Sequence, residues 1–155
     1  MDSAQAHALN SAIRALTLRH RARAAELLAE LGLHPGQEFV LMALAAKGPQ
    51  VQRRLAEEIG CEPPTITHMV RKLEAAGHIA RVPSADDRRA TIVELTPQGR
   101  GLLGRLDEVW LTLAAETVAG IAGTSPGQII DLLRDMAANL RPAGDAAVLE
   151  PPHAI

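Results

Sequence analysis

The spacing of apolar residues changes twice along this chain of 155 residues, and no other feature of the sequence constrains the fold as strongly. Up to Gly77 the apolar residues recur at helical spacing. Ile79–Val82 and Thr91–Leu95 are instead short β-branched runs with alternating side chains, and the polar segment 83–89 joins them. Beyond this hairpin the helical spacing returns. We therefore expect a mainly helical α+β chain, interrupted by one β-hairpin with a charged tip.

Six helical segments are expected, and glycine, proline or capping residues mark their ends. The first runs from about residue 4 to residue 31 and ends at Gly32, and Pro35 opens the second, which stops near Gly48. A short third helix is closed by Gly60, and the fourth runs from Pro63 to Gly77. A long fifth helix begins after Thr96-Pro97, and its apolar stripe reaches Ile121. The last helix runs from the capping box Ser125-Pro126-Gly127-Gln128 to Leu140.

A helix, a short helix, a turn, a further helix and a hairpin, in this order, make a winged helix-turn-helix. We predict that residues 35–96 form this DNA-binding lobe. The helix after the turn needs a polar outer face to enter a major groove about 12 Å wide. That face carries Thr65, Thr67, His68, Arg71 and Lys72. The alternative is the ordinary solvated face of an amphipathic helix.

The tip of the predicted hairpin carries two aspartates followed by two arginines, Asp86-Asp87-Arg88-Arg89. An arginine on a narrow hairpin can enter a minor groove, where negative potential is concentrated. A neighbouring carboxylate can hold its guanidinium in place. A charge cluster that merely solvates a loop is the alternative, but adjacent arginines favour contact with DNA. We therefore count Asp87, Arg88 and Arg89 among the predicted DNA-binding residues.

Composition excludes several other classes of protein. Aromatic residues make up 1% of the chain, which argues against a surface that stacks single-stranded bases. The sequence contains no phosphate-binding glycine loop, nucleophile motif or metal-ligand spacing, so it predicts no enzyme, no cofactor and no metal site. The net charge is −2, but cations gather between residues 68 and 105. Without a signal peptide or a long apolar run, we expect a cytoplasmic protein that does not enter membranes.

Two stretches of the sequence resemble the MarR (multiple antibiotic resistance regulator) family. They are Leu55–Gly60 followed by Pro64–Gly77, and Asp86–Arg89 followed by Val93–Gly99. The resemblance is dense between residues 39 and 101. It implies a homodimer formed through residues 1–34 and 97–140, and the apolar stripes of these segments favour the same assignment. The Ala/Pro-rich segment 141–155 is expected to be a loose tail.

The resemblance also implies how the protein acts. Asp87 and Arg89 would form the wing motif, and the dimer would bind a pseudo-palindromic operator with half-sites about 34–36 Å apart. Relatives usually release DNA when a small, often aromatic or anionic, molecule binds between the dimerisation helices and the lobe. Candidate ligand-binding residues are Arg14, His20, Phe39, Met42 and Trp110, with Arg19, Arg21 and Arg23 as further cations. We favour the alternative that these cations are solvated and the other residues belong to the core.

Some positions depart from the family's pattern or invite a second function. Val51 and Glu62 stand where relatives carry better helix caps, and His68 stands where many carry Arg or another polar residue. Cys61 could sense peroxide, because a thiolate near a helix N-terminus is activated. For Cys61 we favour instead the role of a small, half-buried residue, because peroxide-sensing relatives carry their reactive cysteine near the start of the first helix.

We therefore expect a transcriptional regulator that binds double-stranded DNA as a homodimer, and repression relieved by a small molecule is the expected mode. The alternative function is a winged-helix module whose basic face binds an acidic protein and not DNA.

Overall fold

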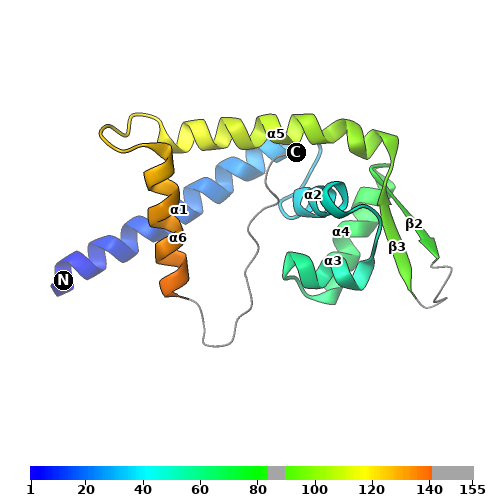
Figure 1. The fold of residues 1–155 in the computed structure, drawn as a ribbon, viewed down its shortest axis with the longest axis horizontal. Helices are drawn as coiled ribbons and strands as arrows, with labels where there is room; N and C mark the ends of the chain where they lie inside the picture. Colours follow the sequence, from blue (N-terminus) through cyan, green and yellow to red (C-terminus); the bar gives the residue numbers. More distant parts are fainter. Residues whose placement is uncertain (84–89, 141–155) are drawn as a thin grey trace.

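The computed structural model describes residues 1–83 and 90–140. Six helices and three strands follow one another within these ranges (Figure 1). They are α1 (Ser3–Ala29), α2 (Gln37–Lys47), β1 (Gln50–Val51), α3 (Gln52–Ile59), α4 (Pro63–Ala75), β2 (Ile79–Pro83), β3 (Thr91–Leu95), α5 (Pro97–Val118) and α6 (Pro126–Asn139). The predicted α+β class and the winged helix-turn-helix order are confirmed. No helix in the described ranges is both long and apolar enough to cross a membrane.

The sheet has three antiparallel strands in the order β1-β3-β2. The β2–β3 hairpin was predicted, and its register runs from Ile79 opposite Leu95 to Pro83 opposite Thr91. The sequence did not indicate β1, because two residues are too few to show an alternating pattern. This strand pairs Val51 with Ile92 and joins the start of α3 to the hairpin.

The expected end of the long helix was wrong by several residues. The apolar stripe predicted for it included Ile121, but α5 ends at Val118 and Ile121 is 52% exposed. The chain leaves the helix here because the ψ angle of Ala119 is 128°, outside the helical range, and Gly120 takes a left-handed φ of +78°. Leu140, expected within the last helix, follows α6 as its cap residue.

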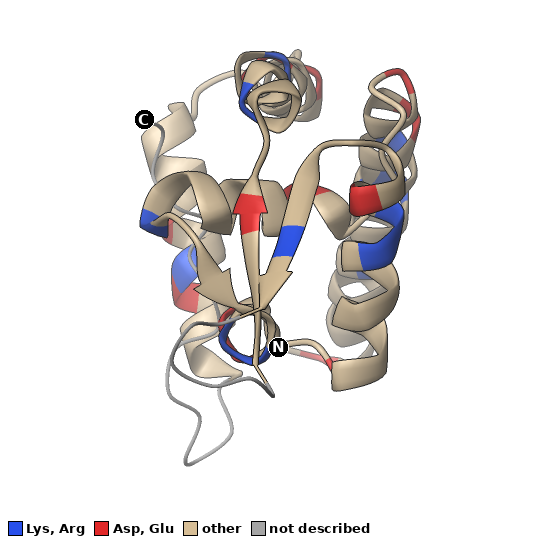
Figure 2. Cartoon of the chain, turned by 90° about the vertical axis from the view of Figure 1, so that its right-hand side faces the viewer, with Lys and Arg blue, Asp and Glu red and all other residues tan. Residues whose placement is uncertain are grey.

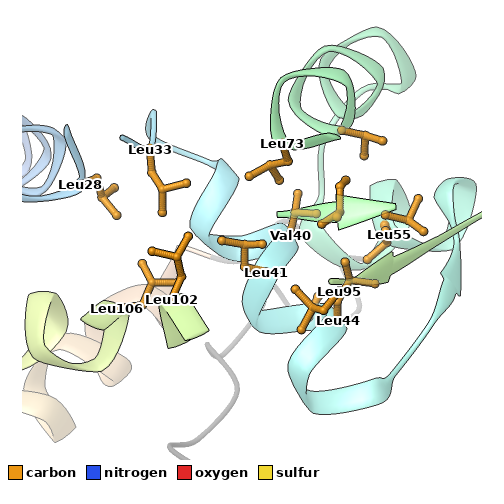
Figure 3. Packing of buried hydrophobic residues seen from close by; sticks show 14 of the residues in the cluster. Leu28, Leu33, Val40, Leu41, Leu44, Leu55, Leu73, Leu95, Leu102 and Leu106 are labelled. Atoms are coloured by element: carbon orange, nitrogen blue, oxygen red, sulfur yellow. The ribbon is translucent and has the colours of Figure 1, made fainter. Parts of the chain in front are cut away.

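The hydrophobic core is centred on α2 (Figure 3). Leu41 of α2 is fully buried, as are Leu28 of α1, Leu55 of α3, Leu73 of α4 and Leu106 of α5. Full burial of one leucine side chain contributes about 1.5–3 kcal/mol to folding. The core therefore joins the winged helix-turn-helix lobe to the inner ends of α1 and α5.

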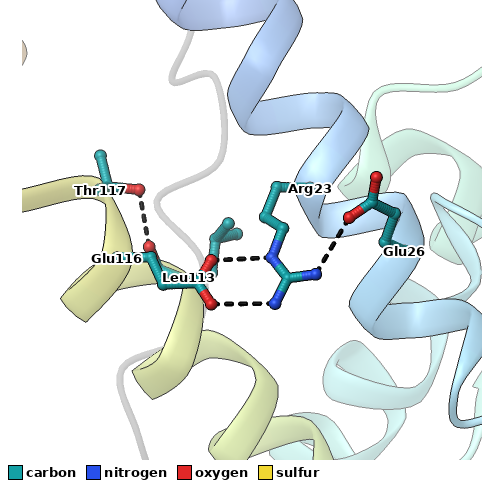
Figure 4. Close-up of polar contacts among 5 residues, drawn as sticks. All are labelled: Arg23, Glu26, Leu113, Glu116 and Thr117. Atoms are coloured by element: carbon teal, nitrogen blue, oxygen red, sulfur yellow. Dashed lines mark hydrogen bonds and ion pairs between the residues drawn. The ribbon is translucent and has the colours of Figure 1, made fainter.

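An ion-pair cluster on the surface links α1 to α5 (Figure 4). The Arg23 guanidinium donates to both carboxylate oxygens of Glu116, at 2.7 and 2.9 Å, and to Glu26 at 3.0 Å. These carboxylates raise the pKa of Arg23 and lower that of Glu116. Because the cluster is exposed, it orients the two helices more than it stabilises them. Arg23 is thus committed to a fold contact.

α6 follows α5 after a loop and crosses α1 in the view of Figure 1. Its capping box at Ser125 and Gln128 is formed as predicted. However, the helix has no buried residue, although it carries Ile130, Leu132, Leu133 and Met136, which are 44–55% exposed. A helix of 14 residues is marginally stable in water without packing. Its apolar side therefore requires a cover that a single copy of the described chain does not supply.

Candidate DNA-binding surface

The fourth helix, α4, presents one apolar and one polar side. Ile66, Val70 and Leu73 are buried against the core, with 0–1% of each residue exposed. Thr65, His68, Arg71 and Lys72 point away from the core and are exposed. Within the described residues, the side chains of His68, Arg71 and Lys72 make no hydrogen bond or ion pair. Three of the predicted DNA-binding side chains are thus available to an external partner.

Thr67 is placed differently from the other predicted residues of this helix. It is half-buried, and its hydroxyl is hydrogen-bonded both to the backbone of its own helix and to Gln52 of α3. The three wing residues Asp87, Arg88 and Arg89 lie outside the described residues. Of the hairpin that carries them, the structure describes the two strands, which end at the pair formed by Pro83 and Thr91.

One arginine of the predicted basic region is occupied within the lobe. The Arg81 guanidinium of β2 donates to Glu74 of α4 at 2.8 Å. The hydrogen bond lowers the pKa of Glu74 and raises the pKa of Arg81. This contact ties the C-terminal end of α4 to the first strand of the hairpin. It therefore fixes the hairpin relative to the helix and withdraws Arg81 from other anions.

Charges of both signs are distributed over the lobe. Figure 2 views the chain from the side of the sheet and shows basic and acidic segments interspersed on strands and helices. On α3, Arg53 donates to Glu57 at 3.0 Å, whereas Arg54 is exposed. A polyanion would thus meet a local set of free cations on α4 and α3, and not a uniformly basic face.

The predicted ligand-binding residues divide into two separate groups. Phe39 of α2 and Trp110 of α5 stack with ring centroids 6.3 Å apart, and Met42 is half-buried. Arg14 and His20 lie exposed on α1, and no polar contact in the described chain joins them to the aromatic pair. None of these five residues lines either of the two pockets described next.

A groove beside α4 was not predicted from the sequence. It has a volume of about 550 Å³ and lies between the α1–α2 loop and the exposed side of α4. Its lining residues are His34, Pro35, Gln37, Pro64, Thr65, His68, Met69 and Lys72. A smaller pocket of about 180 Å³ continues from it past Lys72 to His78. Thr65, His68 and Lys72 therefore belong both to the groove and to the candidate DNA-binding surface.

Three titratable groups of the lobe are buried or half-buried. Burial raises the pKa of Glu38, although the backbone N–H groups of Glu38 and Gly36 act in the opposite direction. Burial also lowers the pKa of His78, which favours its neutral form. For Cys61, burial and the neighbouring Glu62 raise the pKa of the half-buried thiol. A thiol kept protonated is a poor peroxide sensor, which favours the small-residue role for Cys61.

This arrangement, in which a three-stranded sheet supports a helix-turn-helix with a free cationic outer face, defines a winged helix-turn-helix DNA-binding protein. Residues 33–91 match the family model described as "MarR family". A probable transcriptional regulator from Pseudomonas aeruginosa is 28% identical, with a TM-score of 0.72 over 86% of this chain and 96% of that chain. The resemblance to the MarR family predicted from the sequence is therefore confirmed for residues 33–91, the part of the chain that forms most of the winged helix-turn-helix lobe.

Two further solved structures share the fold. BpsR from Bordetella bronchiseptica is 25% identical, with a TM-score of 0.69 over 83% of this chain and 98% of that chain, and its structure concerns regulation of DNA binding by 6-hydroxynicotinic acid. A mutant MarR from E. coli, complexed with operator DNA, is 18% identical and has a TM-score of 0.74 over 91% of this chain and 100% of that chain. At 18% identity, the second comparison supports the fold alone.

Proposed function

We propose that this regulator binds a pseudo-palindromic duplex operator as a homodimer and represses transcription until a small molecule releases it. One observation carries the DNA-binding part of the proposal. The inner side of α4 is locked into the core, while His68, Arg71 and Lys72 stand exposed and without partners in the described chain. A rigid helix with free donors on its outer face suits the major groove, where arginine can bind guanine O6 and N7 together.

Replacement of Arg71 by alanine tests this role. We expect the affinity for a cognate duplex, selected from a random pool, to fall by about 10- to 100-fold, because one bidentate base contact contributes about 1–3 kcal/mol. Fluorescence anisotropy with a labelled duplex measures the change. Preference for the selected sequence over unrelated DNA should fall together with affinity.

Arg105→Ala is the matched control for this experiment. Arg105 is exposed on α5 and lies outside the candidate surface, so the same loss of charge should leave affinity almost unchanged. Equal affinity of the Arg71 variant and the native protein would remove α4 from the interface. Binding of an acidic protein without any preference for a duplex would favour the alternative interaction module.

The homodimer in this proposal is supported by the terminal helices. α6 has no buried residue in the described chain, and its apolar side chains are about half-exposed. Leu9, Ile13 and Leu16 of α1 show the same degree of exposure, between 43 and 47%. Apolar surfaces of this kind on a regulator are expected to be covered by a second copy of the chain. A two-fold dimer would then present two α4 helices to one face of a duplex.

For the effector site, the groove beside α4 is a better candidate than the residues chosen from the sequence. Pro35, Pro64 and Met69 offer an apolar lining, and Lys72 offers a cation. A small aromatic acid fits this combination, and BpsR is regulated by such a molecule. Because His68 and Lys72 face both the groove and the candidate interface, an occupant would compete with DNA for the same side chains.

His34→Trp should block the groove without changing the outer face of α4. His34 is exposed on the α1–α2 loop and lines both pockets. For aromatic acids such as 6-hydroxynicotinic acid that release DNA from the native protein, we expect the half-effective concentration to rise at least about tenfold, the cost of losing about 1.4 kcal/mol of binding. Because a tryptophan in the groove lies beside His68 and Lys72, the release concentration is compared relative to each protein's own affinity for DNA without the acid. An unaltered release concentration in the variant would place the effector elsewhere.

A further inference from the structure

The smaller pocket, of about 180 Å³, lies directly beside the groove at α4, because His34, Gln37 and Lys72 line both spaces. The α1–α2 loop and the start of α2 form one wall of this pocket. The C-terminal part of α4 and His78, in the turn before β2, form the other. A single molecule can therefore occupy the groove and the pocket together.

Gln37 offers hydrogen-bond donors to both spaces. It is the first residue of α2 and is only 4% exposed. Its Oε1 accepts a hydrogen bond from the backbone N–H of His34 at 2.8 Å, which fixes the orientation of the amide group. The amide nitrogen carries two N–H groups, and no hydrogen bond within the described residues uses them. These donors are thus free for a molecule bound between the two walls.

His78 on the opposite wall also lacks a partner. The residue is 8% exposed, and its Nδ1 atom is buried without a hydrogen-bond partner in the part of the chain that the structure describes. Polar atoms in protein interiors are nearly always hydrogen-bonded, because an unpaired one costs free energy. An oxygen atom of a ligand, in the pocket that His78 lines, would supply the missing partner.

The charge around the two spaces favours an anion. Lys72 is exposed, and its side chain makes no hydrogen bond or ion pair within the described residues. The described residues that line the two spaces include neither aspartate nor glutamate. An ammonium group, an amide and an imidazole together suit a carboxylate, whose two oxygens accept several hydrogen bonds. The groove beside them has an apolar lining, from Pro35 and Met69, that suits a ring.

We propose that Gln37, Lys72 and His78 form a carboxylate-binding site, in which the smaller pocket holds the carboxylate of an aromatic acid whose ring lies in the groove. The inference rests on the proposed function, because it places the polar group of the proposed effector. It also narrows the effector class, since an uncharged amide with the same ring should bind poorly. An ion pair with the carboxylate would withdraw Lys72 from DNA, which links occupancy to release.

Titration of the full chain with benzoate and with benzamide, followed by amide chemical shifts in NMR spectra, tests the site. The two compounds share a ring and differ in charge. Gln37→Glu keeps an acceptor for the His34 N–H but replaces the amide donors by an oxygen, and His78→Leu removes both ring nitrogens. Gln128→Glu is the matched control, because Gln128 accepts a hydrogen bond from the Ser125 N–H at 2.8 Å in the same way, at the start of α6. Thermal unfolding checks that each variant is folded.

We expect the native chain to bind benzoate at least about tenfold more tightly than benzamide, the size of one hydrogen bond to a charged group. In Gln37→Glu and in His78→Leu, the affinity for benzoate should fall about tenfold for the same reason, and the affinity for benzamide should not change. Gln128→Glu should keep the native affinities for both compounds.

Three results would overturn the inference while leaving the groove as the candidate effector site. They are equal affinities of the native chain for benzoate and benzamide, native affinity for benzoate in either variant, and an equal loss for both compounds in either variant. If neither compound binds the native chain, the inference and the effector part of the proposed function both fail. Operator binding by the native chain separately tests the DNA-binding part.

Discussion

Gly99→Ala should lower the free energy of unfolding by about 3 kcal/mol, the upper end of the cost of overpacking. Gly99 lies in the first turn of α5, where the chain passes the turn between α4 and β2. A Cβ atom at this position would lie 2.0 Å from the carbonyl oxygen of His78 and 2.9 Å from its carbonyl carbon. Neither is the end of a flexible side chain, so the backbone would have to move.

The contacts around Gly99 show what such a movement would break. Thr96 accepts a hydrogen bond from the Gly99 N–H at 3.0 Å and donates its hydroxyl to Gly77 at 2.7 Å. The Thr96 N–H donates to the His78 carbonyl at 3.1 Å. These bonds join the turn after α4, the start of the hairpin and the start of α5. Their loss should loosen α4 from the hairpin as well as destabilise the chain.

Thermal unfolding at one fixed protein concentration measures the effect, and we expect the midpoint to fall by about 10 °C. Gly101→Ala is the control on the same helix, because nothing lies within 4 Å of its added Cβ. That substitution should be neutral or stabilising by up to about 1 kcal/mol. An equal midpoint for the two variants would show that α5 does not pack closely against His78.

Leu133→Asp should abolish dimerisation and weaken operator binding by about 100-fold or more. The leucine lies on the apolar side of α6 and is 50% exposed in the single chain. In the proposed dimer the partner would bury this side chain, and an aspartate there would have to lose its hydration without a partner charge. A monomer holds one half-site at a time and loses the gain from linked binding, which amounts to about 10²–10⁴ in affinity.

Sedimentation equilibrium and anisotropy with the selected duplex measure the two parts of this prediction. Asn139→Asp places the same charge near the end of the helix, away from Leu133, and should leave the dimer intact. Circular dichroism shows whether the Leu133 variant keeps its helices. If that variant remains dimeric and binds the operator with native affinity, α6 is not part of the interface.

The sequence predicted the fold because each local signal agreed with the others. Gly60, the prolines of α4 and the Thr96-Pro97 start of α5 each lie at the helix end where they were expected. The change from helical to alternating spacing also located β2 and β3 to within a residue. These features depend on residues that are close together in the sequence, so the sequence alone reveals them.

Features that depend on distant neighbours were not predictable in the same way. Strand β1 exists because Gln50 and Val51 meet β3, and its two residues carry no pattern of their own. The groove beside α4 forms only when the α1–α2 loop lies against Met69, next to a Gly36 that takes a φ of +98°. Similarly, no spacing rule links Gln52 to Thr67, 15 residues away. Composition indicated which residues were cationic, but not that Arg81 and Arg23 are held by Glu74 and Glu116.

In the proposed dimer, two copies of α4 bind one face of a duplex, one helical turn apart. The most direct measurement compares the selected operator with versions in which the spacing between half-sites is lengthened. Insertion of about five base pairs turns one half-site to the opposite face of the DNA. Insertion of about ten base pairs returns both half-sites to the same face but at a greater distance. We expect the five-base-pair insertion to reduce affinity to that of a single half-site. Affinity that does not depend on the spacing would show that the two α4 helices do not bind one face of the duplex together.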